Sequence, residues 1–69
     1  MTYYISILEE INRVGEISIE KLSKTFGITY TRTEYLVNKG INDGYLDRFI
    51  NGSTLSVKPR HAERKIKSI

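Results

Sequence analysis

The sequence predicts one small, mainly α-helical domain in which three helices are followed by a small β-hairpin. Apolar residues recur at helical spacing along the first two thirds of the chain, and glycines stand where those patterns end, at Gly15, Gly27 and Gly44. The pair Asn51-Gly52 then separates two β-prone runs. With 69 residues, the chain has room for a single core, because a domain of this size buries roughly 60% of the surface that its unfolded form exposes.

The composition excludes several classes of protein. Eleven Lys and Arg residues stand against eight Asp and Glu residues, which gives a net charge of +3, and cysteine is absent. The chain therefore has no disulfide, thiolate metal site or cysteine nucleophile. Its longest apolar runs are two or three residues, whereas a membrane-spanning helix needs roughly 20. The start, Met1 to Tyr4, lacks the positive n-region of a signal peptide, so we expect a cytoplasmic protein with no membrane partner.

The first two helices are predicted from apolar spacing and from the residues at their ends. A first helix over residues 3–13 is followed by Gly15. The residues on its apolar face recur at separations of three and four and form a single stripe: Tyr4, Ile7, Leu8, Ile11 and Val14. Glu16-Ile17 predicts a short extended connector. Ser18 is a favourable N-cap for a second, short helix over residues 19–25, which Gly27 ends.

A third helix is predicted to begin near Thr31 and to end before Gly44. Thr31 and Glu34 have the spacing of a capping box, in which each side chain satisfies a backbone N–H group of the first turn. The positions expected to face the core are Thr33, Leu36, Val37, Gly40 and Ile41. A glycine inside a helix costs about 1 kcal/mol relative to alanine, so Gly40 predicts that another part of the chain packs closely against the helix.

Residues 45–50 and 53–58 are predicted strands joined by a two-residue turn. Asn51-Gly52 is the strongest short-range signal for a type I′ hairpin turn, and Pro59 ends the second strand. This turn sets a register whose facing pairs are Ile50 with Ser53, Arg48 with Leu55, and Leu46 with Val57.

The two faces of this predicted ribbon differ in their side chains. Leu46, Leu55 and Val57 are expected to cover the helices, whereas Tyr45 and Phe49 lie on the other side. The tail after the hairpin is either a short helix or a frayed basic arm, since its apolar residues at helical spacing, Ala62, Ile66 and Ile69, stand among many basic ones.

The order of three helices, a connector strand and a closing hairpin resembles that of the winged helix-turn-helix domain. The segment from Ile17 to Thr29 resembles helix two and the turn of that family, the segment from Leu36 to Leu46 resembles the end of helix three, and Asn51-Gly52 resembles the wing. Over about two thirds of its length the chain is similar to small archaeal-type and viral regulators. It departs from the family at Thr33, where an aliphatic residue is usual, and at Gly40, where leucine is more frequent.

The resemblance implies a DNA-binding domain over residues 1–58 and a basic tail over residues 59–69. In helix-turn-helix proteins the N-terminal end of the second motif helix reaches base edges in the major groove. The outward residues expected there are Thr29, Tyr30, Thr31, Arg32, Tyr35 and Lys39. Arg32 can donate to guanine O6 and N7, while Lys39 suits a phosphate. In the alternative, Thr31 only caps the helix, the tyrosines pack against a neighbour and Arg32 is solvated.

Further cations are expected to contact the DNA backbone. Arg48 lies near the predicted hairpin tip, from which its guanidinium reaches a minor-groove or phosphate site, or else pairs with Asp47 or Asp43. Lys58 and Arg60 begin the basic tail. The net charge is −1 over residues 1–26, zero over residues 27–57 and +4 over residues 58–69. Because phosphate contacts dominate affinity for DNA, we expect the tail or a second subunit to supply positive charge.

The residues that carry catalysis are missing from this sequence. His61 is the one histidine, so a single chain builds neither a Ser-His-Asp triad nor a two-histidine metal site. No glycine-rich loop of the phosphate-binding kind occurs. We therefore expect no enzyme, no cofactor and no small-molecule substrate.

Two further expectations concern protein partners. A winged-helix module that binds other proteins is the alternative function, with the contact surface supplied by Tyr45, Phe49, Tyr3 and Ile5. A homodimer is also expected, because Tyr3 and Ile5, with Ile66 and Ile69, are apolar groups that the helix stripes leave outside the core.

Overall fold

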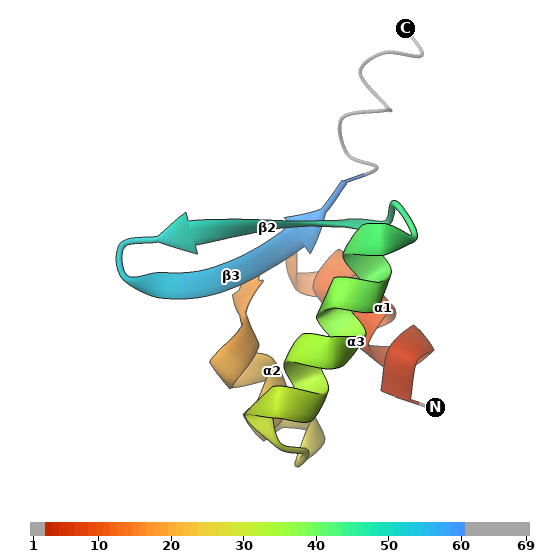
Figure 1. The fold of residues 1–69 in the computed structure, drawn as a ribbon, viewed down its shortest axis with the longest axis vertical. Coiled ribbons are helices and arrows are strands. Elements are labelled where there is room, and N and C mark those ends of the chain that lie inside the picture. Colours follow the sequence, from red (N-terminus) through yellow and green to blue (C-terminus); the bar gives the residue numbers. More distant parts are fainter. Residues whose placement is uncertain (1–2, 61–69) are drawn as a thin grey trace, which may run out of the picture.

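The computed structural model describes residues 3–60, and the predicted tail residues His61, Ala62, Ile66 and Ile69 lie outside that range. The described chain runs through the six elements drawn in Figure 1, in the order α1 (Tyr3–Val14), β1 (Ile17–Ser18), α2 (Ile19–Phe26), α3 (Tyr30–Asn42), β2 (Leu46–Asn51) and β3 (Thr54–Pro59). The hairpin of β2 and β3 lies across one end of the three helices (Figure 1). The predicted fold class, mainly α with a small β-hairpin, is confirmed.

The ends of α2 form as the sequence predicts. The Ser18 side chain accepts a hydrogen bond from the backbone N–H of Lys21 at 3.0 Å, which satisfies a donor that has no partner inside the helix. Gly27 adopts a left-handed conformation with φ 67°, and its N–H donates to the Ser23 carbonyl. Because a side chain at this φ is strained, a glycine is the natural residue for the turn between α2 and α3.

The start of α3 differs from the prediction. The N-cap is Thr29, not Thr31, and its Oγ1 accepts from the backbone N–H of Arg32 at 3.0 Å. Thr31 is already inside the helix, so the predicted capping box with Glu34 does not form. The short turn after Gly27 leaves Thr29 extended, at ψ 157°, which is the backbone conformation of an N-cap.

The sheet has three antiparallel strands in the order β1-β3-β2, and its hairpin register corrects the predicted one. Ile50 faces Leu55, Arg48 faces Val57 and Leu46 faces Pro59, so the turn residues are Gly52 and Ser53. A type I′ turn at Asn51-Gly52 needs positive φ at both residues, but positive φ occurs at Gly52 and at no non-glycine residue from 3 to 60.

The correction leaves the predicted faces of the hairpin unchanged. Each residue of β2 pairs with a residue of β3 that lies two positions beyond the predicted partner. Because side chains on a strand alternate between its two faces, a shift of two positions keeps every side chain on the predicted face. Leu46 and Val57 are buried as expected, and Leu55 is half-buried against the core. The pairing of Val57 with Ile17 of β1 ties the connector strand to this register.

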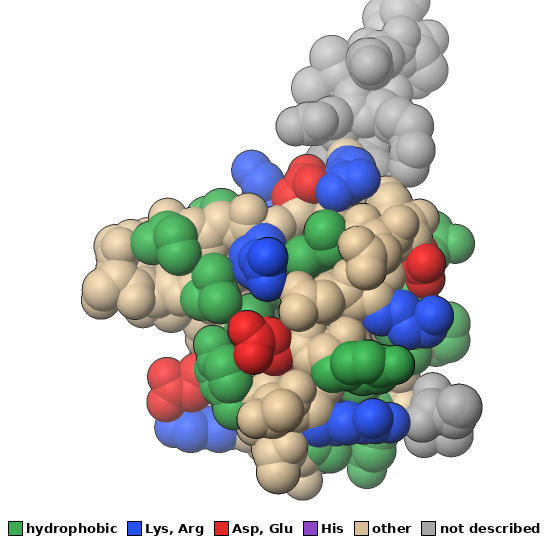
Figure 2. Space-filling view, in the orientation of Figure 1, with side chains coloured by type: hydrophobic (Ala, Val, Ile, Leu, Met, Phe, Trp, Pro, Cys, Tyr) green, Lys and Arg blue, Asp and Glu red, His purple; other side chains and the backbone are tan. Residues whose placement is uncertain are grey.

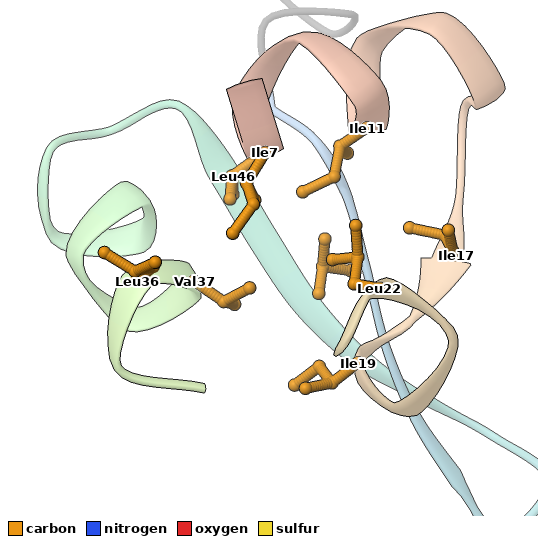
Figure 3. Close-up of a cluster of buried hydrophobic side chains, with 9 residues drawn as sticks. Ile7, Ile11, Ile17, Ile19, Leu22, Leu36, Val37 and Leu46 are labelled. Atoms are coloured by element: carbon orange, nitrogen blue, oxygen red, sulfur yellow. The ribbon is translucent and has the colours of Figure 1, made fainter. Parts of the chain in front are cut away.

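The core fills the space between the helices and the sheet (Figure 3). Its buried hydrophobic residues are Ile7, Ile11, Ile17, Ile19, Leu22, Leu36, Val37, Leu46 and Val57. Val14 was expected in this core, but it is 41% exposed. It is the last residue of α1 and borders an open hollow beside β1 and α2, so no element covers it.

Gly40 packs closely against its neighbours, as the sequence predicts. A Cβ atom at this position would lie 2.7 Å from Leu46 Cδ1 and 3.2 Å from Leu8 Cδ2. Leu46 begins β2 and Leu8 belongs to α1, so the missing side chain lets both elements approach α3. The cost of glycine in a helix is thereby offset by closer packing.

Candidate nucleic-acid interface

The two faces of α3 have opposite surroundings. Its inward residues are Thr33, Leu36, Val37 and Gly40, all buried, and the Thr33 hydroxyl donates to the Thr29 carbonyl at 2.9 Å. The residues spaced by four, three and four on the opposite side are Thr31, Tyr35, Asn38 and Asn42. In Figure 1 α3 lies in front of α1 and α2, and Figure 2, in the same orientation, shows basic, acidic and hydrophobic side chains interspersed over α3 and the hairpin.

The N-terminal end of α3 is exposed, as a groove-reading helix requires. Tyr30 is 42% exposed and Thr31 and Arg32 are also exposed. The Thr29 hydroxyl oxygen, in contrast, is occupied as the cap of α3. Thr29 therefore retains its hydroxyl hydrogen and one lone pair for an outside contact, whereas the Thr31 side chain keeps its donor and both lone pairs.

Arg32 and Lys39 lie on the flank of α3 that faces α1. The Arg32 guanidinium carbon lies 5.5 Å from the centre of the Tyr35 ring, and Tyr35 itself is 58% exposed. Lys39 Nζ lies 5.3 Å from the Tyr4 ring centre of α1 and 3.9 Å from Asp43 Oδ2. Arg32 keeps its full charge for a ligand, whereas the charge of Lys39 is partly neutralised.

Tyr4, on the same side of α3, links α1 to the end of α3 through a hydrogen bond. Its hydroxyl donates to Asp43 Oδ2 at 2.5 Å. Burial, followed by the hydrogen bond to the Asp43 carboxylate and its negative charge, raises the pKa of Tyr4 to about 12, because each effect disfavours a phenolate. The phenol therefore holds the two helices together throughout the physiological pH range.

Arg48 does not lie at the hairpin tip. It stands in the middle of β2, three residues before Asn51, and Nη1 donates to Asn38 Oδ1 of α3 at 2.7 Å. The alternative that Arg48 pairs with Asp47 or Asp43 does not hold either, since neither carboxylate forms an ion pair with it. The guanidinium remains exposed and links the wing to the outward face of α3.

Lys58 and Arg60 lie at the base of the hairpin, where β3 ends. Lys58 is exposed, with Nζ 5.4 Å from the Phe49 ring centre. Arg60 pairs with Asp47 at 2.7 Å and also donates to the Leu46 carbonyl at 2.9 Å. These contacts fasten the end of β3 to the start of β2, so Arg60 has a structural task besides any contact with DNA.

The ion pairs within residues 3–60 separate the free cations from the neutralised ones. Four cations have an acidic partner, namely Arg13, Lys24, Lys39 and Arg60. The four that have none among the described residues are Lys21, Arg32, Arg48 and Lys58. Three of these four belong to the predicted DNA-contacting set. Unpaired cations therefore concentrate on α3 and the hairpin.

Sequence reasoning overlooked two residues of this surface, Asn38 and Asn42. Both follow Thr31 and Tyr35 on the same helical stripe, and they line a shallow hollow with Lys39 and Asp43. Helical spacing alone, extended past the first turn, would have identified them. The contact of Asn38 with Arg48 was not accessible to that reasoning, because it depends on where the hairpin folds back.

The described part of the chain offers little to a metal ion. No group of three or more His, Cys, Asp or Glu residues is close enough to hold one there. A hollow of about 360 Å³ between α1 and α3 is lined by Tyr4, Arg32, Tyr35, Leu36 and Lys39, and its two cations and two phenol rings suit an anionic group. In residues 3–60 we also find no helix with the length and apolar character to span a bilayer.

Comparison with known proteins supports the fold. No protein-family model matches this sequence, and no curated protein matches it. Among solved structures, the oxidized form of MarR from E. coli superposes with a TM-score of 0.78 at 17% identity, covering 94% of this chain and 48% of that one. A structure described as the multiple antibiotic resistance repressor, MarR, gives 0.77 at 16% identity, covering 94% and 49%. This chain spans about half the length of either, and the winged-helix fold is confirmed.

Proposed function

We propose that this protein binds double-stranded DNA in a sequence-specific manner and acts as a transcriptional regulator. In this proposal α3 enters the major groove, and the hairpin and the basic tail contact phosphates. A helix about 10–12 Å across fits that groove. The solved structure named as a repressor supports the regulatory role, since its fold is shared by this chain.

The observation that carries the proposal is the uncovered outward face of α3. Thr31, Tyr35, Asn38 and Asn42 present hydroxyl and amide groups there, which are the groups that read base edges. Arg32 stands on one flank of that stripe and Arg48 on the other, and both lack an ion pair within residues 3–60. Polar groups in the middle with cations at the sides match a groove bordered by phosphates.

The described body is nearly neutral, which bears on affinity. Residues 3–60 hold eight basic and seven acidic side chains, whereas residues 61–69 add three basic and one acidic. Because each neutralised phosphate releases counterions, we propose that the tail, together with a homodimer, raises the affinity. Two of the predicted dimer contacts lie within the described chain, Ile5, which is 57% exposed, and Tyr3, which is 40% exposed and also packs edge-on against Phe26.

A salt titration on random and on selected duplexes tests the proposal. We expect weak binding to random DNA that falls steeply with salt, tighter binding to duplexes selected from random oligonucleotides, and a shallower salt slope after residues 61–69 are removed. Absence of binding at low salt would contradict the proposal. Sedimentation at high micromolar concentration tests the dimer, and a clean monomer would refute it.

A second candidate function is a protein-interaction module, and the exposed apolar groups of the hairpin favour it. Ile50 is 64% exposed and Tyr45 is 53% exposed, and exposed apolar groups of this kind are what a protein partner covers. Phe49, in contrast, is half-buried beneath the Lys58 ammonium, so it contributes less than the sequence predicts. The same titration separates the two functions, because a module of this kind shows no salt-dependent binding to duplex DNA. The cytoplasmic location stays a prediction.

A further inference from the structure

The hydrogen bond between Arg48 and Asn38 joins the wing to the reading face of α3. Asn38 lies on the outward stripe between Tyr35 and Asn42, and it is half-buried rather than free. Arg48 Nη1 approaches its side-chain oxygen to 2.7 Å, a short distance for this kind of bond. The amide of Asn38 is therefore held in one orientation before any ligand arrives.

The chemistry of arginine fixes that orientation. A guanidinium carries N–H donors and no acceptor, so only the amide oxygen of Asn38 can face it. The amide nitrogen, on the other branch of the side chain, must then point away from Arg48. The oxygen and nitrogen of the amide are therefore assigned from the fact that a guanidinium has only donors, and not from the atom positions alone.

An amide held in this way turns its N–H donors away from Arg48 and its oxygen toward Arg48, which occupies one of the two lone pairs of that oxygen. In the major groove guanine offers two acceptors, N7 and O6, and thymine offers O4, whereas cytosine offers only a donor. The usual amide contact with adenine donates to N7 and accepts from N6, so it needs the amide oxygen to face the base, whereas Arg48 holds that oxygen toward the hairpin. An amide that turns its donors to the base therefore favours guanine, which offers two acceptors where adenine and thymine each offer one, and disfavours cytosine on the strand it contacts.

We propose that Asn38 is a base-contacting residue and that Arg48 positions it, so that the pair selects guanine over adenine at one base pair of the DNA site. The inference rests on the proposed function, because it needs α3 to lie in the major groove. Arg48 has further N–H donors beyond the one used, so a phosphate contact by the same side chain is compatible with this role.

Two substitutions at Asn38 separate reading from folding. Asn38→Asp keeps an oxygen for Arg48 but replaces the outward donors with a negative charge, and Asn38→Ala removes both branches. We expect each variant to bind the selected duplex about tenfold more weakly, with Asn38→Asp the weaker. The preference for guanine should disappear at one position only. Thermal unfolding of Asn38→Asp should match that of the parent protein.

The variant Arg48→Ala tests the positioning role by a change of preference. Without the guanidinium the amide of Asn38 is free to turn, so adenine should become as acceptable as guanine at the same position. Lys58→Ala is the matched control, since Lys58 is a cation of the same hairpin whose ammonium lies over the Phe49 ring, whereas the hydrogen bond to Asn38 comes from Arg48. It should lower affinity for all sequences and leave every base preference intact.

The outcomes distinguish this inference from the function on which it depends. If the parent protein selects DNA and the Asn38 variants keep its preference at every position, the inference is wrong and the proposed function stands. A preference for adenine at the contacted position in the parent protein would also overturn it. If the parent protein binds no duplex, both fail together.

Discussion

The inward and outward faces of α3 belong to one helix but are built on different principles. The inward face is closed by packing, with Leu36 and Val37 buried and Gly40 in contact with two other elements. The outward face is held by single polar contacts, such as that of Asn38 with Arg48, and leaves Tyr35 largely exposed. Stability and recognition are therefore assigned to separate residues of the same element, and substitutions on the two faces should have separable effects.

The largest expected effect comes from opening a cavity on the inward face. Leu36→Ala should lower the free energy of unfolding by about 2–5 kcal/mol, because it removes buried methyl groups from a small core. Urea unfolding followed by circular dichroism measures the change. Tyr35→Ala, one residue away on the outward face, is the control and should change stability by no more than about 1 kcal/mol, since it removes only the exposed cation–π contact with Arg32. Equal losses in the two variants would contradict the division between the faces.

Arg32→Ala should have the opposite effect to Leu36→Ala, weakening recognition of DNA while leaving stability nearly unchanged. We expect this variant to lose about 1–3 kcal/mol of discrimination between the selected duplex and one with a substituted base pair. Its unfolding free energy should stay close to that of the parent, since the cation–π contact of an exposed arginine with Tyr35 contributes only about 0.5–1 kcal/mol. Competition binding measures the discrimination. Unchanged preference would remove Arg32 from the reading surface.

Gly40→Ala tests the close approach of α3 to the hairpin. A methyl group 2.7 Å from Leu46 Cδ1 overpacks the core, and this cost exceeds the gain in helix propensity, which leaves a net loss of about 1 kcal/mol. In a Leu46→Val background the clashing methyl is absent, so the same substitution should become neutral or stabilising. A double-mutant cycle from denaturant unfolding gives the coupling. Additive effects would show that the contact is not tight.

The last effect is confined to alkaline pH and concerns Tyr4, at the edge between the two faces. Its pKa is raised from 10.0 to about 12 in the folded protein, so the folded state favours the neutral phenol. The stability that this provides is complete below pH 10 and is lost as the pH rises through about 12. Unfolding measured across this range should show the loss, and Tyr4→Phe should abolish the step. A step of equal size in Tyr4→Phe would assign it to another tyrosine.

The fold was largely predictable because its signals are local. Apolar spacing identified the inward face of α3, and Ser18 and Gly27 marked the ends of α2. Predictions failed where two local signals competed. Thr29 and Thr31 are both capping residues, and the turn after Gly27 decided between them. Asn51-Gly52 and Gly52-Ser53 both suit a hairpin turn, and the pairing of Val57 with Ile17 is consistent with the second.

The candidate site was predictable in composition but not in arrangement. The sequence identified Arg32, Tyr35 and Lys39 as outward groups, and they lie on or beside the exposed face of α3. It could not assign Arg48 to Asn38, ten positions away, or Arg60 to Asp47, thirteen positions away. Such pairs form only when the hairpin folds into its place in the tertiary structure, so a periodic pattern in the sequence does not predict them.

The sequence by itself determined which residues become helix or strand and which side of each element is apolar. Those properties depend on backbone geometry that repeats every few residues. Tertiary structure decided the cap of α3, the hairpin register and the partners of Arg48, Arg60 and Tyr4. Each of these depends on groups far apart in the chain, and Tyr4 meets an aspartate 39 positions away. Distances of that kind are set by packing of the whole core, which no local spacing encodes.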